Sequence, residues 1–191
     1  MKHIILIAAS IAFFTACNSG NNQSKADSDT VQSAQATTSD KPGKPQSASP
    51  VTEIVRSYLA MKDALANDND KDAATAGDAM VAAFEKFDKS SLTASQMKIY
   101  EDVESDAREH AEHIGKNGGN IKHQREHFEM LSKDIYELVK TFGSGQQLYY
   151  DHCPMYNNGK GADWISETKE IANPYLGKEM PNCGAIKEEL K

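Results

Sequence analysis

Residues 93–142 read TASQMKIYEDVESDAREHAEHIGKNGGNIKHQREHFEMLSKDIYELVKTF and predict a hairpin of two long helices. Thr93 followed by Gln96 is typical of a capping box at a helix start, and Asn120 is placed to cap the second helix. Gly118-Gly119 can adopt the left-handed conformation that ends a helix. Apolar residues recur at helical spacing on both sides of these glycines: Ile99, Tyr100, Val103, Ala107, Ala111, Ile114, Phe128, Leu131, Ile135, Leu138, Val139 and Phe142.

Two further amphipathic segments precede this hairpin. Ser49-Pro50 is typical of a helix start, with serine as the cap and proline at the first helical position. A second segment, over about residues 71–87, is rich in alanine and would allow close packing against a neighbouring helix. Four amphipathic segments joined by short turns predict a mainly α fold class. We expect an antiparallel bundle of about four helices over residues 50–145.

Residues 146–187 break the helical pattern and predict a small irregular or β cap. Residues 148–153 look extended, residues 157–161 have the composition of a turn, and residues 162–166 would return as a partner strand. We expect this cap to pack on the bundle and to form one domain with it.

The N-terminus predicts export from the cytoplasm. A positive start, the apolar run Ile4 to Phe14 and then Thr-Ala-Cys resemble a bacterial lipoprotein signal over residues 1–17, with Cys17 as the lipidated residue. The alternative is an ordinary secretory signal with an incidental cysteine. Residues 18–49 are polar and poor in large apolar side chains, so we expect a disordered tether. Because Asn18 rather than aspartate follows Cys17, an outer-membrane lipoprotein facing the periplasm is the expected location.

Charge and motifs argue against several classes of function. A net charge of -7 argues against nucleic acid as a partner and leaves the lipid anchor as the only predicted contact with a membrane. The sequence shows no nucleophile–base pattern, phosphate-binding glycine loop or HExxH motif, so we expect a protein without catalytic activity. A redox enzyme that uses Cys153 and Cys183 is less favoured, because their separation is unlike that of a CxxC active site.

Two short sulfur clusters in the cap predict a soft-metal site. Cys153 and Met155 form the first cluster, and Met180 and Cys183 form the second. Thiolates and thioethers are the ligands that Cu(I) and Ag(I) prefer, whereas zinc would more often take two cysteines and two histidines. His152 is a candidate extra ligand, although adjacent residues of a strand point to opposite faces.

A disulfide between Cys153 and Cys183 is an equally weighted alternative, since exported proteins occupy an oxidising compartment. It would close a loop of about thirty residues and stabilise the cap by roughly 3–4 kcal/mol. Met155 and Met180 would then simply pack beside Trp164.

Four histidines in the predicted hairpin form a second candidate metal site. His110 and His113 are spaced i,i+3, and His123 and His127 are spaced i,i+4, so each pair shares one helix face. Counting outward from the glycine turn places His110 opposite His127 and His113 near the level of His123. The alternative is that His110 makes an internal hydrogen bond and the other three are surface residues.

Several segments of the chain resemble the bacterial domain of unknown function 3347 family: QREHF at 124–128, CPM at 153–155, NGKGADW at 158–164, NPYLG at 173–177 and MPNCG at 180–184. This resemblance covers roughly residues 51–187. The family includes stand-alone lipoproteins and a domain appended to periplasmic adaptor proteins of copper/silver efflux systems. The resemblance therefore implies an association with heavy-metal handling and with such an adaptor as a partner.

Two functions are expected from these observations. The favoured one is a lipoprotein that binds Cu(I) or a similar ion for sequestration or for handover to an efflux adaptor. The alternative is a disulfide-stapled module that docks another envelope protein through its aromatic cap residues, since aromatic side chains are enriched at interface hot spots. Those residues are Tyr149, Tyr150, Tyr156, Trp164 and Tyr175. Arg125 and Glu126 could bridge to the cap, for instance Arg125 to Asp163, but a solvated helix face is the favoured interpretation of both.

Overall fold

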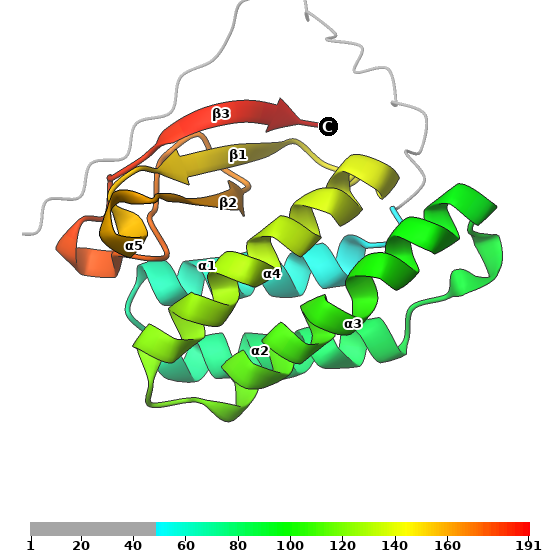
Figure 1. The fold of residues 1–191 in the computed structure, drawn as a ribbon, viewed down its shortest axis with the longest axis horizontal. Helices are drawn as coiled ribbons and strands as arrows, with labels where there is room; N and C mark the ends of the chain where they lie inside the picture. The colour runs from blue at the N-terminus through cyan, green and yellow to red at the C-terminus, as the bar shows by residue number, and fades with distance from the viewer. Residues whose placement is uncertain (1–48) are drawn as a thin grey trace, which may run out of the picture. The chain divides into compact units, whose positions relative to one another are not determined.

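Four helices form the larger part of this protein, which a computed structural model describes from residue 49 to residue 191. They are α1 (Thr52–Ala66), α2 (Asp70–Glu85), α3 (Ala94–Lys116) and α4 (Ile121–Phe142) (Figure 1). Each helix packs against the next one in sequence through a short connection, and α4 also contacts α1. The predicted antiparallel bundle is therefore confirmed. The proposed signal, Cys17 and the tether up to residue 48 lie outside the described residues.

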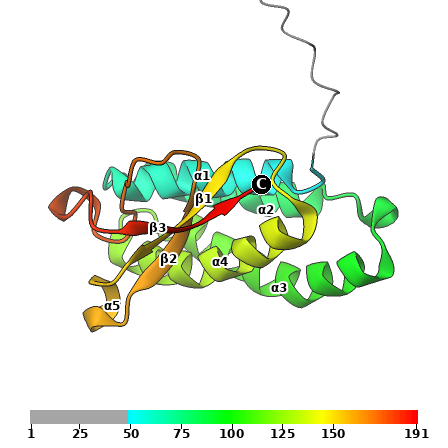
Figure 2. The same cartoon turned by 90° about the horizontal axis from the view of Figure 1, so that it is seen from above.

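A three-stranded antiparallel sheet follows the bundle. Its strands are β1 (Leu148–Cys153), β2 (Ala162–Ser166) and β3 (Ala185–Leu190), in the order β2-β1-β3. Short helices lie in the connections: η1 (Lys89–Ser91), α5 (Tyr156–Gly159) and η2 (Gly177–Glu179). Figure 2 shows the sheet lying across α1 and α4, and α2 and α3 lie on the far side of the bundle. Within residues 49–191, no helix combines the length and the apolar character that a membrane span requires.

The sheet agrees only in part with the expected cap. The hairpin of β1 and β2 has the predicted bounds, and its register pairs Cys153 with Ala162. Strand β3 was not predicted, and it extends three residues beyond the expected end of the cap at residue 187. Most of its residues are exposed, so its sequence lacks the apolar alternation that indicates a half-buried strand.

The local rules for helix ends hold for α3 and α4 but not for α1. Thr93 and Gln96 form the predicted capping box, and the Asn120 side chain accepts from the His123 amide. The prediction that Ser49 caps the first helix was wrong, because α1 begins at Thr52. Instead, Ser49 Oγ donates to the Gly143 carbonyl at 2.6 Å, which ties the start of α1 to the end of α4.

Tyr58 joins the bundle to the sheet. Its ring stacks on Phe128 of α4 with a centroid separation of 5.0 Å, and its hydroxyl accepts from the Ile165 amide of β2 at 3.0 Å. The same hydroxyl lies 2.8 Å from Ser132 Oγ. Tyr58 is fully buried, and burial holds the pKa of its hydroxyl well above the usual range. The helices and the sheet therefore share one hydrophobic core.

Close packing of α2 on α3 depends on Gly77. A Cβ atom added there would lie 2.7 Å from the Ala111 carbonyl oxygen and 2.8 Å from the Gly115 nitrogen, both in the backbone of α3. The alanine-rich character of α2 predicted a close approach to a neighbour. The structure shows that the two helix backbones approach each other closely at this glycine.

Replacing Gly77 with alanine should therefore destabilise the protein by about 1–3 kcal/mol, because the two helix backbones must move apart. Helix propensity alone predicts the opposite sign, since alanine is favoured over glycine by about 1 kcal/mol inside a helix. Chemical denaturation would measure the difference. Gly118→Ala is the matched control, because the nearest atom to its added Cβ would be the Ala74 Cβ at 3.4 Å. Equal stability of the two variants would contradict the close approach.

Candidate functional site

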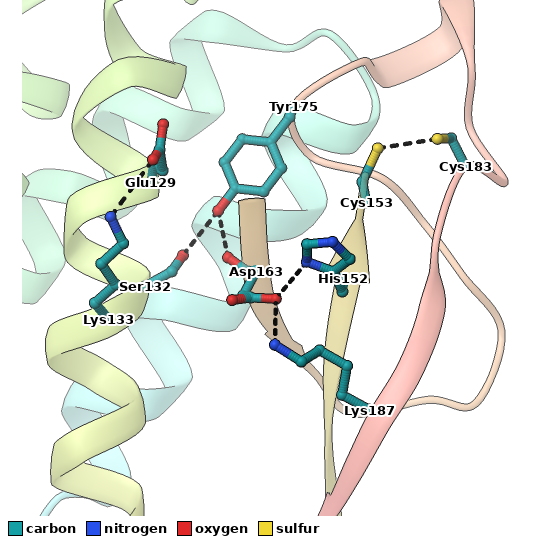
Figure 3. A network of polar contacts seen from close by, with 9 residues as sticks. All are labelled: Glu129, Ser132, Lys133, His152, Cys153, Asp163, Tyr175, Cys183 and Lys187. Atoms are coloured by element: carbon teal, nitrogen blue, oxygen red, sulfur yellow. Dashed lines mark hydrogen bonds and ion pairs between the residues drawn. The ribbon is translucent and has the colours of Figure 1, made fainter. Parts of the chain in front are cut away.

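The two cysteines of the cap lie in contact. Cys153 is the last residue of β1 and is buried, whereas Cys183 lies in the loop before β3 and is partly exposed. Their sulfur atoms are 2.9 Å apart, and both thiols are free (Figure 3). The structure therefore brings together the two cysteines that the sequence paired, at a place that solvent reaches from the Cys183 side.

Asn173 holds the loop that carries Cys183. Its side-chain amide donates to the Cys183 carbonyl at 2.6 Å, and its side-chain oxygen accepts from the amides of Tyr175 and Leu176. Its backbone amide donates to the Pro181 carbonyl. Asn173 is fully buried, so these hydrogen bonds are shielded from water. Sequence reasoning treated this segment as irregular. The asparagine before a proline, which is typical of a turn, was the available indication.

The two thiols differ in acidity. Burial alone would raise the pKa of Cys153, but hydrogen bonds to its sulfur from the Cys183 thiol, the Met155 and Tyr156 amides and the Asn173 side chain outweigh burial. The pKa of Cys153 therefore lies below its ordinary value. The pKa of Cys183 is raised, chiefly because its thiol donates to Cys153. Cys153 is thus the sulfur that ionises first, and a thiolate is the form that binds metals.

The two methionines of the sulfur clusters are exposed at the surface. Met155 is 58% exposed and Met180 is 39% exposed, so neither is buried beside Trp164 as the disulfide alternative supposed. Their backbones support the thiols, since the Met155 amide donates to the Cys153 sulfur and the Met180 carbonyl accepts from the Cys183 amide. Both thioethers lie within three residues of a thiol.

His152 lies next to Cys153 in sequence but is bound to a different group. Its Nδ1 lies 2.7 Å from an oxygen of Asp163 in β2, and the same oxygen accepts from Lys187 of β3 at 3.1 Å (Figure 3). Burial tends to raise the pKa of Asp163, but the hydrogen bonds from Lys187 and His152 outweigh it and keep the pKa below the usual value. Asp163 therefore links β2 to β1 through His152 and to β3 through Lys187.

Arg125 does not lie on a solvated face, since its side chain is only 14% exposed, and it does not pair with Asp163. Arg125 instead contacts Asp68 at 2.6 Å, in the turn between α1 and α2, and donates to the carbonyls of Leu65 and Pro174. Arg125 lies in the second turn of α4, next to that turn and to the Asn-Pro segment, whereas Asp163 is held by His152 and Lys187. A link to the cap exists, but its acceptor there is the Pro174 carbonyl.

All four histidines of the helical hairpin meet. The rings of His113 and His127 stack at a centroid separation of 4.3 Å, and His123 approaches His127 at 4.5 Å. His110 Nδ1 lies 3.1 Å from His127 Nδ1. One ring nitrogen each of His113, His123 and His127 lies within 4.8 Å of the others. The sequence predicted that these histidines lie at matching positions along α3 and α4, and the structure confirms this.

Two imidazoles of this cluster, those of His127 and His110, favour the neutral form. Burial lowers the pKa of His127 to about 4, with further lowering from the positive charge that His113, His123 and His110 would carry. The pKa of His110 is also lowered, mainly by burial. Neutral imidazole is the form that binds metal ions. This cluster and the thiol pair are built on different elements, α3 and α4 for the histidines, β1 and the loop before β3 for the cysteines.

Comparison with known proteins gives one match. No curated protein and no solved structure matches the chain. A family described as a protein of unknown function, DUF3347, matches residues 54–147. The matched residues run from the third residue of α1 to the end of the loop before β1, so they comprise nearly all of the helical bundle, including the four histidines. This match confirms, for the helical bundle, the resemblance to the DUF3347 family.

Proposed function

We propose that this protein binds a soft heavy-metal ion, Cu(I) or Ag(I), through Cys153 and Cys183. The observation that carries the proposal is the 2.9 Å separation of the two sulfur atoms. Two cysteines far apart in sequence are held side by side by the Asn173 hydrogen bonds, so both sulfur atoms can reach one ion once they move apart to make room for it. Soft ions prefer thiolate ligands, which supports a monovalent copper-type cargo over calcium or magnesium.

The thioethers extend the site toward solvent. Met155 and Met180 are exposed and flank the two thiols in sequence, so each can swing in as a third or fourth soft ligand. An ion bound at a partly exposed thiol with flexible thioethers beside it can also be passed on. This favours a role in sequestration or in handover to a periplasmic efflux adaptor. The lipoprotein-like N-terminus would hold the protein at the outer membrane, facing the periplasm.

The alternative role as an aromatic docking module has less support. Trp164, Tyr175 and Tyr149 are buried, and Tyr150 and Tyr156 are only partly exposed. Tyr175 stacks on Tyr156 with a centroid separation of 4.6 Å, so these rings are used within the fold. Aromatic anchors at an interface must be available to the partner. We therefore prefer metal binding to protein docking.

Competition with a chromogenic Cu(I) chelator under reducing, anaerobic conditions tests the proposal. The chain from Asn18 onward, which carries no other cysteine, should bind one Cu(I). Cys153→Ser/Cys183→Ser should weaken binding by more than about 100-fold, because loss of groups that merely support a ligand already costs 10–100-fold. Met155→Leu/Met180→Leu is the companion variant and should weaken binding less, because it keeps both thiolates. Circular dichroism would confirm that each variant is folded.

The oxidation state of the thiols separates binding from a structural staple. Oxidised protein should lose Cu(I) binding, because a disulfide offers no thiolate. Equal Cu(I) affinity of the reduced wild-type protein and the double serine variant would overturn the proposal. The proposal would also be overturned if the protein bound no Cu(I) while both thiols were reduced. The remaining role for Cys153 and Cys183 would then be to form a structural disulfide.

A further inference from the structure

We propose that His113, His123 and His127 form a second metal site, for a borderline divalent cation such as Zn²⁺, Cu²⁺ or Ni²⁺. This site does not depend on the thiol pair, and its ligands have a different chemistry. Imidazole nitrogen suits these divalent ions, whereas the thiols suit Cu(I). Among residues 49–191, this trio is the one group of three or more histidine, cysteine and carboxylate side chains whose ligand atoms gather closely enough to share an ion.

The distances fit three ligands on one ion. The three ring nitrogens lie within 4.8 Å of one another. Two nitrogens bound to a tetrahedral zinc at 2.0–2.1 Å are separated by about 3.4 Å. Closing the remaining gap requires rotation of partly exposed side chains, because a ring nitrogen binds an ion in the plane of its ring and the rings of His113 and His127, stacked at 4.3 Å, must tilt toward a common point.

The backbones that carry the three ligands are fixed. His123 and His127 are one helical turn apart on α4, and His113 faces them from α3. Gln124, which is fully buried, donates to the Ile114 carbonyl of α3 at 3.1 Å and so locks the two helices together at this level. A site on rigid helices keeps its ligands in register when no ion is bound.

Each ligand has a second polar partner on one ring nitrogen. His123 Nδ1 lies 3.4 Å from Glu126, His113 Nε2 lies 3.8 Å from Glu109, and His127 Nδ1 lies 3.1 Å from His110. Histidines that bind metals usually use their other nitrogen in this way, which orients the ring and increases its basicity. An ion bound by all three rings would take the opposite nitrogen of each. The two carboxylates also make the surroundings favourable for a cation.

Three imidazoles leave further coordination positions free. The side chains of His113 and His123 are 44% and 34% exposed, so solvent can supply a fourth ligand and the ion can enter. Structural zinc sites are normally closed by four protein ligands, whereas a three-histidine site keeps an open position. We therefore infer an exchangeable site that accepts a metal ion and can release it.

Isothermal titration with Zn²⁺ alone tests this inference, using the chain from Asn18 onward with Cys153→Ser/Cys183→Ser so that thiols cannot contribute. One Zn²⁺ should bind per chain. His123→Ala/His127→Ala should weaken binding by more than about 100-fold, because two of three ligands are lost. His152→Ala is the matched control, since this histidine lies in β1 and is bound to Asp163, and it should leave Zn²⁺ binding unchanged.

Two further measurements detect the site without using the histidine variants, which could fail to fold. Cu²⁺ added to the same chain should give an electron paramagnetic resonance spectrum with nitrogen coupling from imidazole. In the wild-type protein, Zn²⁺ should shield His123 and His127, but not His152, from modification by diethyl pyrocarbonate. Zn²⁺ affinity that survives His123→Ala/His127→Ala, or modification that Zn²⁺ does not change, would overturn the proposal. Neither outcome affects the Cu(I) test, which measures a different ion and different residues.

Discussion

Replacing Tyr58 with alanine should lower the free energy of unfolding by about 3–5 kcal/mol, the usual cost of removing a large buried aromatic side chain. The substitution removes a fully buried ring that stacks on Phe128, and it removes the hydroxyl that accepts from the Ile165 amide. Tyr58 belongs to α1, Phe128 to α4 and Ile165 to β2. We therefore expect helical and sheet signals to be lost in one transition, because a single side chain links all three elements.

Tyr58→Phe separates the hydroxyl from the ring. The phenylalanine keeps the stacking on Phe128 but leaves the buried Ile165 amide without its acceptor, which should cost about 1–3 kcal/mol. Ser132 is less affected, because its hydroxyl also donates to the Phe128 carbonyl and accepts from Tyr175. Urea denaturation followed by far-ultraviolet circular dichroism and by Trp164 fluorescence measures both effects. Two separate transitions in the wild-type protein would show that the bundle and sheet do not share one cooperative core.

The sequence was sufficient for the helical part of the fold because each helix end and apolar face is a local property. Thr93 with Gln96 and Asn120 set the starts of α3 and α4, and the structure confirms both caps. Where a contact distant in sequence competed with a local signal, the prediction failed. Ser49 was assigned to cap α1, but its hydroxyl is used by the Gly143 carbonyl, which is distant in sequence.

The candidate sites show the same division between local and distant information. The meeting of the four histidines followed from counting residues on both sides of one glycine turn. The contact of Cys153 with Cys183 was proposed from their chemistry, but its support by Asn173 depends on a loop whose path no local pattern describes. Strand β3 was missed for a related reason. Its residues are mostly exposed, and its pairing with β1 is set by the chain reversal after Cys183.

Replacing Asp151 with asparagine should stabilise the protein at neutral pH. Asp151 lies in β1 and is fully buried, and neither of its carboxylate oxygens has a hydrogen-bond partner among residues 49–191. Lys62 partly offsets the charge, but its amine is engaged by Asp63 at 2.6 Å and Glu167 at 3.0 Å. Burial therefore dominates and raises the pKa of Asp151 to about 6.

The sign of the pH dependence follows from this raised pKa. Between the ordinary pKa of about 4 and the folded pKa, the folded protein holds a proton that the unfolded chain has released. Stability should therefore fall as the pH rises from about 4 to about 6, and the loss should be complete above that range. A shift of about two pKa units corresponds to about 3 kcal/mol at most. Asparagine is neutral at every pH and resembles the protonated acid in shape.

Asp151→Asn should therefore gain about 1–3 kcal/mol over the wild-type protein at pH 8 and about nothing at pH 4. Urea denaturation at both pH values measures the gain. Asp163→Asn is the matched control on the neighbouring strand. Hydrogen bonds from Lys187 and His152 keep the pKa of Asp163 below its ordinary value, so this substitution should destabilise the protein at pH 8. A loss of stability in Asp151→Asn at pH 8 would mean that its carboxylate is paired after all.

Asp151 and Cys153 occupy alternate positions of β1, so an ionised Asp151 lies on the same face as the thiol proposed to bind the metal. The carboxylate would then be retained for its charge beside that thiol, at a cost in stability that the asparagine variant measures.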